Sequence, residues 1–269
     1  MVPNLTEYHR PQTLDEALKL LHDSHTAPLA GGTGLLVTPN KQINAVVDLQ
    51  SLDLRGIKID DGKLRIGATT TLADIVESET LSGNAGQLLR DAAHRAGPNT
   101  YRNAATAGGL IASRPPVSEL LTALLVLDAQ LELAGAEPVS RPLADYLAGA
   151  SAEGLIVGVS LAWPATGVGA AHHVARTPSD SPIVHVTAWA GKSGVRVAAG
   201  GMGVRTVRLS QVEQAVAAGL TEATVEAAVG AVEAIMPLTD FRGSAEYRRA
   251  MLSVLVRRAL RNCMPHARR

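Results

Sequence analysis

The order of the predicted helices and strands changes late in the chain, and this change most constrains the fold. Before residue 165, short apolar strands alternate with amphipathic helices. After it, three strands precede three helices. The strands are predicted at 172–175, 183–190 and 195–199, and the helices at 210–218, 224–235 and 245–263. Blocks of strands followed by blocks of helices are typical of α+β domains. We therefore predict an α+β fold.

Two changes of pattern divide the chain. Trp163-Pro164, followed by a glycine-rich stretch, marks one boundary. The other lies near Ile57, where alternating, half-buried strands begin. We predict residues 1–56 as an N-terminal subdomain and 57–165 as a second subdomain. Residues 166–269 are predicted to form a C-terminal domain with a three-stranded antiparallel sheet and three helices.

Capping boxes mark two predicted helix starts. In this pattern a Ser or Thr side chain accepts from the N–H three residues later, and the acid there reaches back. Thr13 with Glu16 and Ser210 with Glu213 fit it. A further helix is predicted just after Gly34, where a short strand ends in a glycine-rich turn.

Composition excludes several classes of protein. Lys+Arg and Asp+Glu both number 25, and this balance argues against nucleic-acid binding. Cys263 is the only cysteine, so the chain alone holds no disulfide, cysteine-based zinc site or iron–sulfur cluster. The aliphatic run at 123–127 is far shorter than the ~20 residues of a membrane span. We expect a soluble, cytoplasmic protein with no bound metal.

Two glycine pairs are the strongest candidates for a binding site. The first lies in the segment Leu29-Ala30-Gly31-Gly32-Thr33-Gly34-Leu35-Leu36, and the second in Thr106-Ala107-Gly108-Gly109-Leu110. Glycines leave successive backbone N–H groups free to face an anion. Two such nests are able to hold a diphosphate from two sides, although any one glycine pair is also consistent with a tight turn. Neither pair matches the G-x-G-x-x-G pattern of nicotinamide-binding folds.

The sequence resembles a known family at five places in the same order. The first glycine segment looks like the AGGT-D-LL loop of the flavin subunits of molybdenum hydroxylases, and residues 101–112 look like their R-N-x-A-T-x-G-G-N-I-A loop. Tyr8-His9-Arg10-Pro11 resembles the family's N-terminal motif, and 199–202 a strand end in its C-terminal domain. Residues 240–249 resemble its D-x-R-A-S-A-E-Y-R-R helix.

This resemblance implies a p-cresol-methylhydroxylase-type (PCMH-type) FAD-binding fold of two α+β subdomains, with a C-terminal domain that caps the flavin. It implies FAD as the cofactor of an oxidoreductase, the medium subunit of a molybdenum hydroxylase. Electrons would come from a [2Fe–2S] small subunit, while a molybdopterin large subunit oxidises the substrate. The single cysteine is consistent with this division of labour.

The resemblance also implies which residues contact FAD. They are Leu29, Ala30, Gly31, Gly32, Thr33, Gly34, Leu35 and Leu36 in the first segment, Thr106, Ala107, Gly108, Gly109 and Leu110 in the second, and Glu119, Ile156 and His173. No catalytic residue is implied. The chain departs from the family pattern at Leu110 (usually Asn), Glu119 (usually Asp), Ala171 (a Tyr in some members) and His173 (often Lys).

These departures keep other functions open. A free-standing enzyme of the same fold, with FAD retained or lost, is the main alternative, and a non-catalytic scaffold is another. Glu119 is also a plausible first-turn acid at a helix start. His172 and His173 point to opposite faces of a strand, which disfavours a metal site. The eight arginines from Arg242 onward suggest either a solvated face or a docking surface for an acidic partner.

Overall fold

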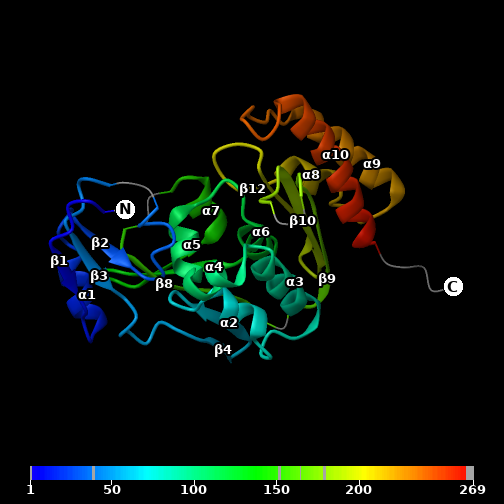
Figure 1. The fold of residues 1–269 in the computed structure, drawn as a ribbon. Coiled ribbons are helices and arrows are strands. Elements are labelled where there is room, and N and C mark those ends of the chain that lie inside the picture. The colour runs from blue at the N-terminus through cyan, green and yellow to red at the C-terminus, as the bar shows by residue number, and fades with distance from the viewer. Residues whose placement is uncertain (1, 38–39, 151–152, 164, 178–179, 265–269) are drawn as a thin grey trace.

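The computed structural model describes residues 2–37, 40–150, 153–163, 165–177 and 180–264. It confirms the α+β class, with three separate sheets. The N-terminal sheet lies at one end of the molecule and the last two helices at the other (Figure 1). The strands of each sheet fall within one of the three predicted ranges, which we retain as proposed domains.

The N-terminal subdomain is a small parallel sheet with one helix. Its elements are β1 (Glu7–His9), α1 (Leu14–Leu20), β2 (Thr26–Leu29) and β3 (Ala45–Asp48). The central strand β3 is buried throughout, as a parallel strand requires. Thr13 caps α1 by accepting from the N–H of Glu16, whose carboxylate accepts from the N–H of Gln12 at 3.0 Å.

The helix predicted after Gly34 is wrong. Residues 32–37 form turns, in which the N–H of Leu36 donates to the carbonyl of Gly32 at 3.0 Å. Glycine is a poor helix former, and Pro39 follows within one turn in the sequence, which disfavours a helical residue before it. The first glycine segment therefore has no helix behind it.

The second subdomain is an antiparallel sheet covered by helices, with the strand order β4-β5-β8-β6-β7. Its strands are β4 (Ile57–Asp60), β5 (Lys63–Gly67), β6 (Gln130–Ala134), β7 (Val139–Pro142) and β8 (Leu155–Ala162). Its helices are α2 (Leu72–Glu77), α3 (Gly83–His94), α4 (Asn99–Ala104), α5 (Ala107–Ser113), α6 (Glu119–Val126) and α7 (Leu143–Ala148). Every residue of α6 is buried, so this helix is the centre of the core.

The C-terminal domain has one strand more than predicted. Its elements are β9 (Gly167–Val174), β10 (Val184–Gly191), β11 (Gly194–Gly200), β12 (Val207–Arg208), α8 (Ser210–Ala215), α9 (Glu222–Ala231), the 3-10 helix η1 (Val232–Ala234) and α10 (Ala245–Asn262). The added strand β12 has two residues, too few to show an alternating pattern. The sheet lies between α10 on one face and α3 and α6 of the second subdomain on the other.

The capping box predicted at Ser210 does not form. Leu209 is the N-cap residue of α8, without a side-chain cap. The carboxylate of Glu213 instead accepts from Arg208 and, at 2.8 Å, from the N–H of Val197 on β11. Glu213 therefore joins α8 to the sheet, because its carboxylate accepts from Arg208 and from the backbone of β11 and not from the first turn of its own helix.

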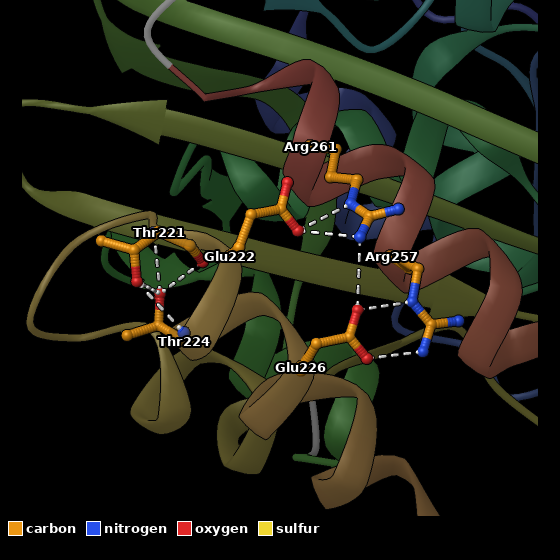
Figure 2. A network of polar contacts seen from close by, with 6 residues as sticks. All are labelled: Thr221, Glu222, Thr224, Glu226, Arg257 and Arg261. Atoms are coloured by element: carbon orange, nitrogen blue, oxygen red, sulfur yellow. Dashed lines mark hydrogen bonds and ion pairs between the residues drawn. The ribbon is translucent and has the colours of Figure 1, made fainter.

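Arginines of α10 pair with acids on α9 (Figure 2). Arg257 donates to both oxygens of Glu226 at 2.8 and 2.7 Å, and Arg261 lies 2.8 Å from Glu222. These side chains are partly exposed, so solvent screening leaves each pair a small contribution to stability. For these two arginines, the prediction of a solvated face is supported over that of a docking surface.

Cys263 is expected to be unreactive in the folded protein. It is 3% exposed, and burial raises the pKa of its thiol to about 12. The thiolate is the nucleophile, so we expect no maleimide labelling at neutral pH until denaturant unfolds the chain. Mass spectrometry of the labelled protein measures this. Labelling of the native protein at the rate of the unfolded one would contradict the burial.

Candidate functional site

The two glycine segments meet in space. A Cβ added to Gly31 would lie 1.7 Å from the backbone oxygen of Ala104, at the end of α4. A Cβ added to Gly108 would lie 2.7 Å from the Cβ of Ala68. Neither position has room for a side chain. Glycine at 31 lets the N-terminal subdomain pack directly on the end of α4, and glycine at 108 lets α5 pack against Ala68 within the second subdomain.

A cavity of about 610 Å³ lies between the two segments. Its wall includes nine of the predicted contact residues together with Ile156 on β8. They are Ala30, Gly31, Gly32, Thr33, Gly34 and Leu35 from the first segment and Thr106, Gly108 and Gly109 from the second. The predicted residues Leu29, Leu36, Ala107 and Leu110 lie outside this wall. Leu110 instead belongs to the core of the second subdomain.

The first segment presents unpaired backbone donors. Among the described residues, the N–H groups of 31–35 donate to no protein atom, and all five residues line the cavity. Gly32 has φ +71°, a conformation that favours glycine and turns the chain back on itself. Successive unpaired N–H groups in such a turn form a nest that attracts an anion.

The second segment has its donors already paired. The N–H groups of Ala107 and Gly108 donate to the carbonyls of Thr70 and Ala68, both at 2.9 Å. The N–H of Gly109 donates to the side chain of its own N-cap residue, Thr106, at 3.2 Å. This segment therefore has no free N–H groups at 107–109 to offer an anion. A cofactor predicted to contact it would make van der Waals contacts with its glycines.

Glu119 and His173 lie outside the cavity wall, and the structure brings them to each other. The Glu119 carboxylate is buried at the start of α6, where it accepts from Arg95 Nε. His173 Nδ1 on β9 lies 3.1 Å from its other oxygen, without hydrogen-bond geometry. Glu119 therefore connects α3 and α6 of the second subdomain to the C-terminal sheet and stabilises the contact between the two domains. FAD contact by either residue stays a prediction.

His185 is buried beside Glu119 and His173. It lies opposite His173 in the β9–β10 ladder and opposite Gly200 in the β10–β11 ladder. A Cβ on Gly200 would lie 2.1 Å from His185 Cε1, so the ring fits only against glycine. Neither ring nitrogen has a hydrogen-bond partner within the described part of the chain. Burial lowers the pKa of His185 to about 4, although the nearby Glu119 carboxylate opposes the shift.

This buried imidazole predicts a loss of stability in acid. The unfolded chain binds a proton below pH 6.5, whereas the folded protein binds it only near pH 4. The free energy of unfolding should therefore fall by about 3 kcal/mol as the pH drops through this window. His185→Leu should flatten the profile, measured by urea unfolding across that range. An unaltered slope in His185→Leu would contradict the assignment.

Sequence reasoning missed one aromatic residue of the cavity. Tyr146 on α7 lines it and is 5% exposed, and its hydroxyl has no partner among the described residues. The guanidinium of Arg114 lies 3.6 Å from the centre of its ring. Arg114 itself has φ +43° as the C-cap of α5. The sequence predicts only a connection with a short helix at 141–146, and no motif in that segment indicates a ligand.

Two sequence families match the chain. The FAD binding domain in molybdopterin dehydrogenase matches residues 4–162, and the CO dehydrogenase flavoprotein C-terminal domain matches residues 180–263. The chain belongs to the FAD-binding subunits of the molybdenum hydroxylase family. It is therefore a subunit of an FAD-dependent oxidoreductase.

Relatives of this FAD-binding subunit match it over nearly its whole length. The uncharacterized protein YgfM of Escherichia coli K12 is 30% identical over 263 residues, 96% of each chain. The carbon monoxide dehydrogenase medium chain of Afipia carboxidovorans is 28% identical over 288 residues, the full length of both. The carbon monoxide dehydrogenase structure from Hydrogenophaga pseudoflava superposes with a TM-score of 0.87 at 27% identity, covering 98% of both chains.

The cavity fits a flavin dinucleotide. Unpaired N–H groups at 31–35 suit a diphosphate, and the apolar side chains of Leu35, Leu49 and Ile156 suit an aromatic ring system. No group of three metal-ligating side chains gathers in the described residues. Within the same residues, no helix is long and apolar enough to cross a membrane.

Proposed function

We propose that this subunit holds FAD in the cavity between its two glycine segments and serves as the exit for electrons from a [2Fe–2S] partner. The observation that carries the proposal is the run of unpaired N–H groups at 31–35 on the wall of that cavity. FAD supplies the reversible uptake of electrons, which no side chain of the protein provides. A molybdopterin subunit would oxidise the organic substrate.

The residues of the cavity have separate parts in this proposal. The backbone at Gly31, Gly32 and Gly34 binds the diphosphate, and the Thr33 hydroxyl is a further donor. Leu35, Leu49 and Ile156 pack on a ring and exclude water. Thr106, Gly108 and Gly109 let the dinucleotide approach closely. Tyr146 lines the same cavity.

The partners and the location rest on this chain's chemistry and on its relatives. One cysteine cannot ligate an iron–sulfur cluster, so the electron donor must lie on another chain. Relatives are named as parts of assemblies, such as the dehydrogenase complex subunit alpha of Paenarthrobacter nicotinovorans. A cytoplasmic location belongs to the same proposal, because a chain with one cysteine has no internal disulfide of the kind that oxidising compartments favour.

A free-standing enzyme of this fold is the second candidate. It is favoured by the observation that three residues at which the chain departs from the family pattern lie away from the cavity wall. Leu110 lies in the core, and Glu119 and His173 contact each other, so none of the three lines the cavity. Such a protein would work on a small molecule without molybdenum partners.

One purification separates the two candidates. The protein is isolated from its native host with the chains that co-elute, and its absorption spectrum, iron and molybdenum are measured. A flavin spectrum with an iron–sulfur chain and a molybdopterin chain supports the proposal. A flavoprotein that elutes alone supports the free-standing enzyme, and a chain that stays colourless after FAD is added contradicts both flavin functions.

A further inference from the structure

The chain's only phenylalanine is on the surface. Phe241 is 82% exposed, at the tip of the connection between η1 and α10. Three neighbours are also largely exposed: Met236 at 76%, Leu238 at 55% and Val204 at 71%. Leu238 bridges the two connections, because its N–H donates to Met202 O at 2.9 Å. We call Val204, Met236, Leu238 and Phe241 the apolar patch. Exposed apolar side chains that gather on two joined connections are candidates for an interaction site.

The turn that carries Phe241 is rigid. Asp240 and Gly243 exchange backbone hydrogen bonds at 3.2 Å each, which closes a tight turn with Phe241 and Arg242 at its tip. The Asp240 side chain accepts from the N–H of Arg242 at 2.8 Å. Arg176 donates to the Phe241 carbonyl at 2.8 Å. Phe241 is therefore held in the exposed position by its own backbone.

A buried arginine anchors this turn to the sheet. Arg248 on α10 is 3% exposed. It donates to the carboxylate of Asp240, to the carbonyl of Gly243 at 3.3 Å and to the carbonyls of Ile183, at 3.0 Å, and Gly201. Burial of a charged group costs desolvation energy, so a buried arginine that fixes a surface turn suggests that the turn has a function. The anchor pre-organises the patch, which lowers the entropy lost when a partner binds.

The charge around the apolar patch is positive. Arg176, Arg205, Arg242 and Arg249 surround it, and in the described part of the chain none of them contacts a carboxylate. Arg176 and Arg205 donate to carbonyls, Arg249 to a carbonyl and to Met236 Sδ, and Arg242 lies over the Phe241 ring. Asp180 is the acid that lines the same hollow as Phe241. On α10, by contrast, Arg257 and Arg261 have acids of this chain as partners.

We propose that the apolar patch docks the molybdopterin chain of the complex, through a pocket for Phe241 with an acidic rim. Aromatic and arginine side chains at the centre of a patch are the usual anchors of protein interfaces. No residue of the patch lines the FAD cavity, whereas an electron donor must lie close to it. This assigns the patch to the chain that need not approach the flavin. The inference rests on the proposed function, because it requires that complex.

The test compares tagged protein purified from the native host as wild type, Phe241→Ser, Arg242→Glu and a control, Ile59→Ser. Ile59 is 45% exposed on β4, outside the patch. FAD, iron, molybdenum and co-eluting chains are measured for each. We expect both patch variants to keep their FAD content. The amount of molybdopterin chain that co-elutes with them should fall about tenfold. The control should match the wild type.

Each contrary outcome has its own meaning. Patch variants that keep the wild-type content of molybdenum overturn the inference and leave the proposed function standing. So does loss of the iron–sulfur chain with the molybdenum chain retained. Wild-type protein that holds FAD but captures neither chain overturns the proposed function and the inference with it. Self-association of wild type that Phe241→Ser abolishes, or its binding to anionic vesicles, assigns the patch to another occupant and also overturns the inference.

Discussion

Gly31→Ala is expected to weaken FAD binding strongly and to destabilise the fold. The new methyl group would lie 1.7 Å from the backbone oxygen of Ala104, so the first glycine segment must move away from the end of α4. Overpacking against backbone costs about 1–3 kcal/mol or more. Since about 1.4 kcal/mol is tenfold in affinity, we expect FAD binding to weaken by about a hundredfold or more. Thermal unfolding and quenching of flavin fluorescence measure the two effects.

Gly230→Ala is the matched control for this variant. Gly230 lies in α9, and a Cβ there would meet nothing within 4 Å. An alanine in a helix is favoured over glycine by about 0.8–1.0 kcal/mol, so this variant should be slightly more stable with unchanged FAD affinity. Wild-type affinity in Gly31→Ala would mean that the close approach of the two segments is irrelevant to the cofactor.

Glu119→Ala is expected to cost about 3 kcal/mol of stability. Its carboxylate is 5% exposed, and its loss leaves Arg95 without an acid at the contact between domains. We expect the FAD affinity to stay close to wild type, because Glu119 lies outside the cavity wall. Chemical denaturation and FAD titration of the same preparation separate these two effects.

Glu226→Ala provides the comparison for Glu119→Ala. Glu226 contacts two arginines as well, but its side chain is 49% exposed (Figure 2). Exposed ion pairs contribute little to stability because water screens them, so this variant should be only slightly destabilised. A strong loss of FAD affinity in Glu119→Ala, with stability retained, would reverse our assignment and make Glu119 a cofactor contact.

Local patterns predicted the elements with strong signals. The N-cap at Thr13, the buried helix α6 and the C-terminal helix α10 were predicted correctly because their signals depend on neighbouring residues. The helix after Gly34 was wrong because two glycines outweigh the apolar residues that follow. The strand β12 was missed because its pairing partner on β11, not its own sequence, makes it a strand.

The site was less accessible from sequence than the fold. The glycine segments stood out in the sequence and the family resemblance gave them a cofactor, but the close approach of Gly31 to the end of α4 depends on long-range packing. Tyr146 joins the cavity from a helix that carries no motif. The paired donors at Gly108 and Gly109 also escape sequence reasoning, because their acceptors include Ala68, far away in the chain.

The most direct test is hydrogen–deuterium exchange of the segment 29–36 with and without FAD. Its N–H groups at 31–35 have no acceptor among the described residues, so they should exchange rapidly in the free protein. We predict that FAD slows their exchange strongly, because a bound diphosphate becomes their acceptor. Exchange that stays fast while FAD is bound would show that the cofactor sits elsewhere.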